Sequence, residues 1–259
     1  GIMMNSECVF DELGVEEDHW RYQNDPAWAL PLAKAYNDKA EKIVGRRLIN
    51  EQAADPARRY PPVKMLHDIF EAKNIWHGNS WWLQQSARNE DELKALLDRV
   101  DDRLHDLRAF ILPPNWAEEK ARLMGIGVKP PVYRGQRGPV TFATSVYGAE
   151  DLIFLILDNP DLATRFSNTI KRAMLELARV LDEEADYTPE NAPRGFWFAD
   201  DNCCLLNPEM YKLFGYPVLK AMFDRYSPDA KDPRFQHSDS NMAHLLPLLG
   251  TLNLTGTNF

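Results

Sequence analysis

Residues 195–240 decide the fold, and they read "GFWFADDNCCLLNPEMYKLFGYPVLKAMFDRYSPDAKDPRFQHSDS". The segment begins with a short aromatic stretch typical of a strand, which ends in two carboxylates. A helix is expected next, because Asn207 precedes Pro208 in the way an N-cap precedes the first helical position. The stretch "RFQHSDS" (234–240) then has the pattern of a second strand, which also ends in polar residues. The segment therefore predicts strand, helix and strand in succession.

The same rhythm extends to both sides of this segment. Upstream, "PVYRGQRGPVTFAT" (131–144) reads as a strand running into a Gly-Pro break, and a helix is expected over 159–185, with Asn159 as its cap. Downstream, a helix is expected over 241–250 and a strand over 252–259. Alternating strands and helices predict parallel strands joined by crossover helices, hence an α/β fold. A closed (β/α) barrel and an open doubly wound sheet both place their sites at the carboxyl ends of the strands. The missing Gly-rich phosphate fingerprint favours the barrel.

Residues 1–112 are expected to be mostly helix and loop. A helix is predicted between Asp25 and Gly45, and another from the cap candidate Asn89 onward, with leucines at helical spacing. We expect a single domain over residues 1–259, in which residues 113–259 hold the clearest barrel units.

The bulk properties narrow the class of protein. Hydrophobic residues make up 44% and charged residues 27% of the chain, as in ordinary globular proteins. The net charge of −9 argues against nucleic acid as the main partner. Three cysteines form no disulfide framework, the acidic N-terminal segment lacks a secretory pattern, and the longest apolar run is "LIFLIL" (152–157). We expect a cytoplasmic protein with no membrane partner.

Asp200 and Asp201 follow the strand predicted at 196–199. Adjacent strand residues point to opposite faces, so only one of the two carboxylates needs to face a site. Its role would be that of a general acid or base, or that of a carboxylate that fixes a loop. The neighbouring Cys203 and Cys204 are interpreted as buried structural thiols, because adjacent cysteines chelate a metal poorly and no CxxC is present.

His237 and Asp239 lie two residues apart at the end of a strand and can converge on one point. Three interpretations stay open: a metal pair, an acid–base or substrate-binding pair, and a structural corner in which Asp239 caps the next helix. Arg134 and Arg137 are candidates for binding the carboxylates of a substrate, or for salt bridges to Asp200 or Asp201.

Three segments resemble the uroporphyrinogen decarboxylase superfamily, in family order over residues 132–259. They are "RGPVTFATSVYGAEDLIFLILDNPDLATRF" (137–166), "DDNCCLLNPEMYKLFGYPVLKAMF" (200–223) and "QHSDSNMAHLLPLLGTLNLTGTNF" (236–259). The resemblance implies a (β/α)8 TIM barrel, C-terminally incomplete in this chain, with its site in the C-terminal mouth.

The superfamily includes porphyrinogen decarboxylases of porphyrin biosynthesis, which need no cofactor, and zinc methyltransferases that act with corrinoid proteins. The tyrosine of the decarboxylase site falls on Ser145 here, with Tyr147 nearby, and its serine falls on Asp201. The methyltransferases bind zinc through a His-x-Cys element, which is His237-Ser238-Asp239 in this chain.

The leading hypothesis is a decarboxylase-type enzyme of this superfamily, acting on an anionic small molecule, tetrapyrrole-like or methylated, by acid–base chemistry. Asp201, His237 and Asp239 would be catalytic. The substrate would contact Arg134, Arg137, Ser145, Tyr147, Asp200, Asn202 and Asn258. One alternative is a metal-dependent methyltransferase or demethylase paired with a corrinoid protein, with zinc on His237 and Asp239. A second is a tetrapyrrole or corrinoid binding module without catalysis. A homodimer is also expected.

Overall fold

The computed structural model describes residues 6–53 and 55–258. The chain divides into two compact units. The first is built from residues up to Arg59 together with residues 76–82, and the second from residues 60–75 and from residue 83 onward. The chain therefore enters the first unit twice.

The first unit is helical. Its longest helix, α3, begins after Asp25, whose side chain accepts from the backbone N–H of Trp28, and ends at Gly45 in the left-handed conformation (φ 72°). The helix predicted between these two residues is thus confirmed. Val9, Tyr36 and Ala40 are buried together in its core. The elements are α1 (Ser6–Leu13), α2 (His19–Asn24), α3 (Pro26–Val44) and the 3-10 helix η1 (Pro56–Arg58).

A two-stranded hairpin is formed by β1 (Lys73–His77) and β2 (Ser80–Gln84). Its two turn residues, Gly78 and Asn79, both have positive φ (55° and 62°), as a type I′ turn requires. Residues 76–82 at its tip belong to the first unit, where the rings of Trp76 and Trp81 lie with that of Trp20, with centroids 5.3–5.5 Å apart.

Asparagine caps begin the main helices of the second unit. The side chains of Asn89, Asn159 and Asn207 each accept a backbone N–H in the first turn of α5, α10 and α11, which confirms the three predicted helix starts. The helices predicted to continue from Asn89 and from Asn207 are each interrupted, at Asp106 and at Gly215. The helices before β3 are α4 (Leu66–Ile69), α5 (Glu90–His105), α6 (Leu107–Ile111) and α7 (Trp116–Gly125). Those between β3 and β4 are α8 (Pro139–Tyr147), α9 (Ala149–Asp158) and α10 (Pro160–Glu184). Those after β4 are η2 (Asp201–Leu205), α11 (Pro208–Phe214), α12 (Tyr216–Tyr226), η3 (Ala243–Leu245) and α13 (Leu246–Gly250).

The sheet of the second unit has four parallel strands in the order of the chain, β3-β4-β5-β6. They are β3 (Gly135–Arg137), β4 (Phe196–Ala199), β5 (Arg234–His237) and β6 (Gly256–Asn258). This confirms the α/β class and the parallel pairing. The predicted (β/α)8 barrel is wrong: the strands of residues 6–53 and 55–258 form only this open sheet and the hairpin. An open sheet and a closed barrel share the same succession of strands and helices, and residues 6–53 and 55–130 contribute no strand to the parallel sheet.

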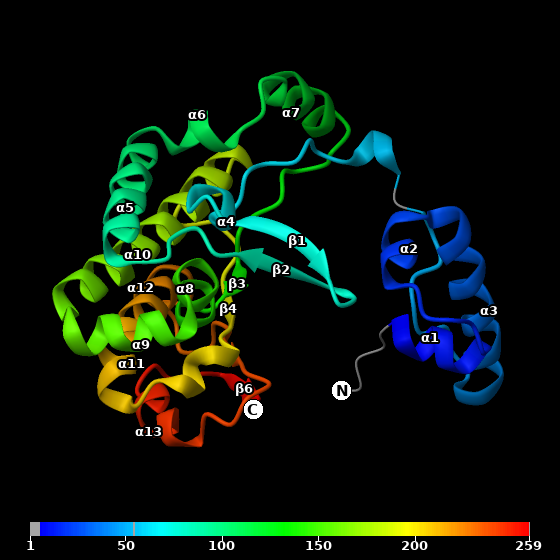
Figure 1. The fold of residues 1–259 in the computed structure, drawn as a ribbon. Helices are drawn as coiled ribbons and strands as arrows, with labels where there is room; N and C mark the ends of the chain where they lie inside the picture. The colour runs from blue at the N-terminus through cyan, green and yellow to red at the C-terminus, as the bar shows by residue number, and fades with distance from the viewer. Residues whose placement is uncertain (1–5, 54, 259) are drawn as a thin grey trace. The chain divides into compact units, whose positions relative to one another are not determined.

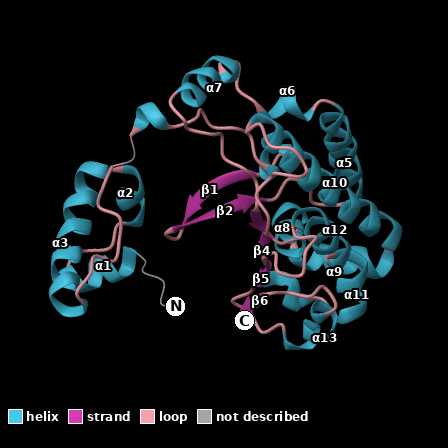
Figure 2. Ribbon diagram, turned by 180° about the vertical axis from the view of Figure 1, so that it is seen from behind, coloured by secondary structure: helices cyan, strands magenta, loops and turns pink. Residues whose placement is uncertain are grey.

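Helices cover one face of this sheet. Figures 1 and 2 show α8 to α12 on one side of the four strands. Phe196 and Phe198 of β4 point into this layer and are buried, and the core includes Phe166 of α10 and Phe223 of α12. Trp197, between the two phenylalanines, points to the other face and is exposed.

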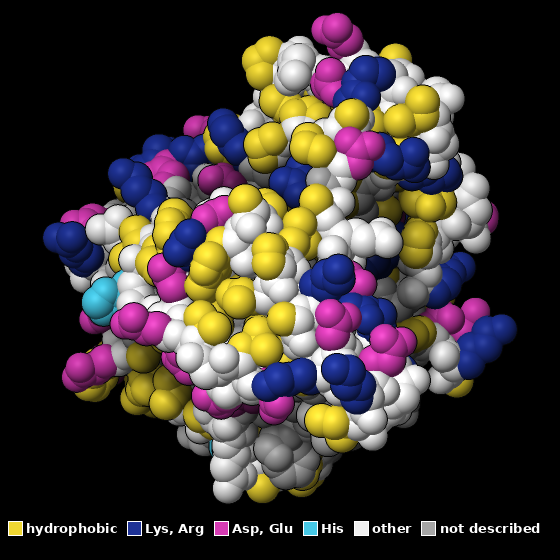
Figure 3. Space-filling view, turned by 90° about the vertical axis from the view of Figure 1, so that its right-hand side faces the viewer, with side chains coloured by type: hydrophobic (Ala, Val, Ile, Leu, Met, Phe, Trp, Pro, Cys, Tyr) yellow, Lys and Arg dark blue, Asp and Glu magenta, His cyan; other side chains and the backbone are white. Residues whose placement is uncertain are grey.

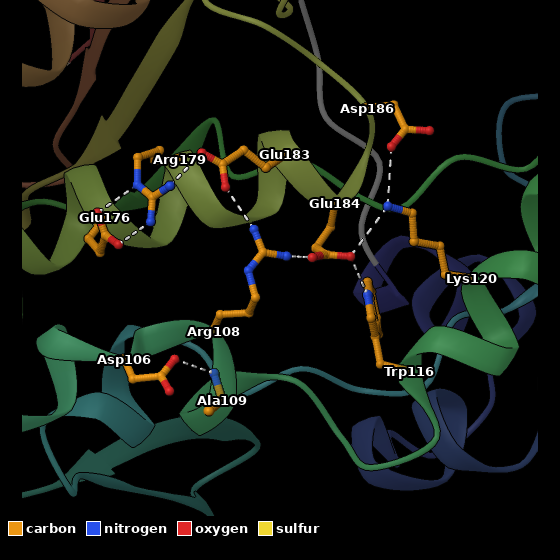
Figure 4. Close-up of polar contacts among 10 residues, drawn as sticks. All are labelled: Asp106, Arg108, Ala109, Trp116, Lys120, Glu176, Arg179, Glu183, Glu184 and Asp186. Carbon is orange, nitrogen blue, oxygen red and sulfur yellow. Dashed lines mark hydrogen bonds and ion pairs between the residues drawn. The ribbon is translucent and has the colours of Figure 1, made fainter.

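The C-terminal end of α10 is fastened to α6 and α7 through a buried carboxylate (Figure 4). Glu184 accepts from the indole N–H of Trp116 (2.7 Å), pairs with Arg108, and lies 3.4 Å from Lys120 Nζ. A buried carboxylate needs such partners because burial removes its hydration. Glu184 therefore holds three helices together with one side chain.

The surface in Figure 3 mixes basic with acidic side chains. No single helix among the described residues is long and apolar enough to cross a membrane. By length and composition alone, the pair Pro139–Tyr147 and Ala149–Asp158, bent by 103°, meets the same criterion together.

Candidate metal centre

The candidate site lies where the parallel strands end. Beyond the last paired residues the backbone ladder continues through N–H to carbonyl hydrogen bonds. The backbone N–H of Gly138 donates to the carbonyl of Ala199 (2.6 Å), that of Asp200 to the carbonyl of His237 (2.9 Å), and that of Ser238 to the carbonyl of Asn258 (3.0 Å). Because all four strands run the same way, the residues that follow them share one edge of the sheet. The polar clusters of the sequence are thereby brought together.

Three side chains converge at this edge. One ligand atom from each of Asp201, His237 and Asp239 lies within 4.8 Å of the other two. His237 Nε2 is 3.3 Å from Asp239 Oδ1 and 3.9 Å from Asp201 Oδ1, and the backbone N–H of Asp239 donates to Asp201 Oδ1 (2.8 Å). The Asp239 side chain is 83% exposed, whereas that of His237 is 28% exposed. We call these three residues the triad.

Asn258 contacts the triad histidine at Nδ1, and the orientation of its amide decides which tautomer of His237 is favoured. His237 Nδ1 lies 3.0 Å from Asn258 Oδ1 and 2.8 Å from Asn258 Nδ2. If Oδ1 accepts from Nδ1–H, then Nε2 keeps a lone pair that faces the two carboxylates. If Nδ2 donates to Nδ1, then Nε2 carries the proton and donates toward Asp239. The first arrangement suits a metal ligand and the second suits an acid–base pair.

Asp200 points away from the triad, into the layer of helices. Its Oδ1 accepts from the backbone N–H of Thr141 (2.7 Å) in the first turn of α8, and burial raises the pKa of this carboxyl to about 7. A Cβ on Gly138 would lie 2.1 Å from the Cβ of Asp200, so only glycine fits there. Asp200 therefore joins β4 to α8 and is not on the side of the triad.

A second polar contact fixes the loop that carries Asp201. Asn202 donates through Nδ2 to Thr144 Oγ1 (2.7 Å), and its backbone N–H donates to Thr141 Oγ1 (3.0 Å). Ser145 Oγ donates to the carbonyl of Thr141 (2.8 Å) within α8. Thr141 and Thr144 were not predicted from the sequence. The Gly-Pro break before them marked a helix start but gave no sign of which residues would face η2.

Arg134 and Arg137 lie at opposite ends of β3. Arg134 precedes the strand, and its guanidinium binds both oxygens of Asp182 (2.7 and 2.8 Å) and lies over the ring of Tyr226. Arg137 ends the strand and shares a row across the sheet with His237. Only Arg137 is therefore at the edge that carries the triad.

Tyr147 is buried in the hydrophobic core, where its ring meets that of Phe166 edge-on, and burial raises its pKa. Cys203 is buried with its sulfur 3.9 Å from that of Met242, and burial raises the pKa of its thiol, as expected of a structural cysteine. Cys204, the other cysteine of the pair, is half-buried.

The triad suits a divalent cation. Ligands that share a cation at about 2.0–2.2 Å lie roughly 3–4 Å from one another. The two contacts of His237 Nε2, at 3.3 and 3.9 Å, already fall in this range. Two carboxylates and one imidazole, without sulfur, are donors for Zn²⁺, Fe²⁺ or Mn²⁺. Because Asp239 offers an oxygen and none of the three residues offers a thiolate, these donors favour a harder cation than a thiolate site does.

Comparison with known proteins gives a likeness among solved structures only. No family model and no curated protein matches the chain, so neither comparison supports membership of the decarboxylase superfamily or a role in porphyrin biosynthesis. Among solved structures the chain is similar to a methyltransferase from Methanosarcina mazei, with 14% identity and a TM-score of 0.48. The likeness covers 96% of this chain, which spans 66% of the length of the other.

Proposed function

We propose that this chain is a metal-dependent methyl-transfer enzyme whose triad holds a divalent cation. The observation that carries the proposal is the convergence of Asp201, His237 and Asp239 at the carboxyl edge of the parallel sheet. The sequence resemblance to the zinc methyltransferases supports metal-dependent methyl transfer, because His237 and Asp239 occupy the two positions of their zinc-binding His-x-Cys element. The partner it implies is a corrinoid protein.

The protein supplies placement and charge. Asp201 is held by the backbone of Asp239 and by the loop that Asn202 fixes, while Asn258 orients His237. The two carboxylates make the site anionic, which favours a cation over a neutral ligand. When bound, the cation would supply Lewis acidity, which promotes ionisation of a thiol near neutral pH.

A second function is favoured by one contact. His237 Nε2 lies 3.3 Å from Asp239 Oδ1, which is close enough for a hydrogen-bonded acid–base pair that needs no metal. Such a pair would act on an anionic small molecule, with Arg137 at the same edge. The two functions differ in the tautomer of His237 and in their need for a cation.

Metal analysis of the purified full chain tests the proposal. After dialysis against Zn²⁺, then Mn²⁺, the wild type is expected to retain about one equivalent, measured by mass spectrometry of the metal. Asp201→Asn and His237→Ala should lose it, because two remaining ligands bind weakly. Exposed residues of α5 give matched controls, Asp102→Asn and His105→Ala, which should retain the metal. A wild type that binds neither cation, yet whose activity on an anionic substrate requires His237, would favour the acid–base alternative.

A further inference from the structure

The face of the sheet opposite to the helices carries two rows of side chains defined by the register. Residues paired in neighbouring parallel strands point to the same face. One row is Gly135, Trp197, Phe235 and Gly256, and the next is Arg137, Ala199, His237 and Asn258. The first row is aromatic in its two central strands. The second row contains the triad histidine and the asparagine that orients it.

The glycines of the first row make room for the rings beside them. A Cβ on Gly135 would lie 1.8 Å from Nε1 of Trp197, so the indole occupies the space that a side chain on β3 would fill. A Cβ on Gly256 would lie 3.0 Å from the ring of Phe235. Each ring thus lies over the edge strand next to it. The indole of Trp197 is nevertheless 49% exposed. We call Trp197 and Phe235 the aromatic floor.

The aromatic floor adjoins the triad. Phe235 is two residues before His237 in β5, which places it about 6.6 Å away along the strand on the same face. Trp197 is separated from the Asp201 loop by Ala199, whose methyl group is small. The aromatic floor and the triad histidine are therefore in adjacent rows on the same face of the sheet.

We propose that Trp197 and Phe235 bind the flat, unsaturated ring of an anionic small-molecule substrate whose reacting group lies at the triad. This inference rests on the proposed function and adds the class of substrate to it. A π-face gives stacking energy to a planar ring and much less to a saturated one. Arg137, at the end of the second row, gives the same face a cation for an acidic substituent. Because the floor is in the row next to that of the triad, a ring bound there would lie beside His237.

A matched pair of acids tests this inference with the full chain. Isothermal titration of 2-naphthoate and of decahydro-2-naphthoate compares ligands of equal charge and similar bulk, one flat and one saturated. The wild type should bind the flat acid at least about fivefold more tightly. Trp197→Ala and Phe235→Leu should each lower the affinity for 2-naphthoate by about tenfold. Trp197→Phe should lower it by about threefold or less, because an aromatic face remains. Trp82→Ala, which removes an exposed tryptophan of the hairpin, is the control and should bind as the wild type does.

Several outcomes would overturn the inference. One is equal affinity for the two acids. Another is wild-type affinity in a Trp197→Ala protein whose circular dichroism and melting curve are unchanged. A third is a dimer that Trp197→Ala converts to a monomer without any binding of 2-naphthoate, because the floor would then be an interface between copies.

The same titrations separate this inference from the proposed function. If the His237→Ala protein binds 2-naphthoate and the wild type takes up no cation, the ring-binding role of the aromatic floor is supported and the proposed metal site is refuted. If the wild type takes up the cation but does not bind 2-naphthoate, the metal site is supported and the ring-binding role of the floor is refuted.

Discussion

At the scale of the residue, the adjacent Asp200 and Asp201 show how one pair of identical side chains acquires two roles. Asp200 continues the alternation of β4 to the buried side, where it accepts from the first turn of α8 and its pKa rises to about 7. Asp201 begins η2 and faces His237. The alternation was predictable from the sequence. Which of the two carboxylates is buried was not, because it depends on the close approach of Gly138.

Asn258 should tune the metal site through His237. Asn258→Leu removes the partner of Nδ1 and should weaken Zn²⁺ binding by about tenfold to a hundredfold, whereas Asn258→Asp offers only an acceptor and should bind at least as tightly as the wild type. Competition with a chromogenic chelator measures both affinities. Asn168→Leu, an exposed position on α10, serves as the control. Equal losses in the leucine and aspartate variants would mean that Asn258 does not orient the histidine.

Glu71 should make stability depend on acid pH. Hydrogen bonds from Arg99, together with the ion pair to Arg103, lower the pKa of Glu71 to about 2. The unfolded chain therefore binds this proton first, near the ordinary value of 4.5, and the stabilisation is lost as the pH falls from about 4.5 to 2. Urea titrations of the wild type and Glu71→Gln should differ by about 1–2 kcal/mol at pH 6 and converge near pH 2. Glu118→Gln, an exposed change on α7, should show no such convergence. A constant difference between Glu71→Gln and the wild type over this range would contradict the assignment.

At the scale of the element, helix starts were predictable and helix breaks were not. Asn89, Asn159 and Asn207 are local signals, since each cap bonds within its own first turn. Pro217 lies in the first turn of α12, but the apolar pattern continues across the break between α11 and α12 and favoured one helix. Arg134 shows the opposite case. Its bidentate partner, Asp182, is 48 residues away in the chain, and no local pattern indicates that contact.

Replacing Glu184 should cost more stability than replacing its exposed neighbour Glu183. Glu184→Leu leaves Arg108 and Lys120 without their buried counter-ion and the Trp116 indole without an acceptor, so the free energy of unfolding should fall by about 3 kcal/mol. Its neighbour Glu183 pairs with Arg108 at the surface, and Glu183→Leu should cost at most about 1 kcal/mol. Urea unfolding compares the two variants. Equal losses would show that burial of Glu184 does not determine the strength of this junction.

At the scale of the whole molecule, the class of fold was predictable and its closure was not. Strand–helix alternation specifies parallel strands, but it is satisfied both by eight strands around a barrel and by four in an open sheet. Residues 6–53 and 55–130 form helices and a hairpin, so the strands needed for closure are not among the described residues. The predicted location of the site does not depend on closure of the barrel, because an open parallel sheet also brings the carboxyl ends of its strands together.

The two units should differ in stability. The core of the second unit runs through α5, α8, α10 and α12, whereas that of the first includes Val9, Tyr36 and Ala40. In hydrogen exchange followed by mass spectrometry, amides of α3 should therefore exchange before those of α10. Added Zn²⁺ should slow exchange in β4, β5 and η2, with no effect on α3, because a ligand stabilises only the unit that binds it. Equal protection of α3 and α10 would indicate one cooperative unit instead.

The hairpin tip of residues 76–82 has a consequence for synthesis on the ribosome. The first unit takes this tip from a later part of the chain, after the segment 60–75 that belongs to the second. The helices α1 to α3 therefore leave the ribosome before Trp76 and Trp81 exist to meet Trp20. The unit that is translated first is completed only after part of its neighbour has been made. No single cut in the gene separates the two, and a truncation at residue 59 would leave Trp76 and Trp81 without Trp20.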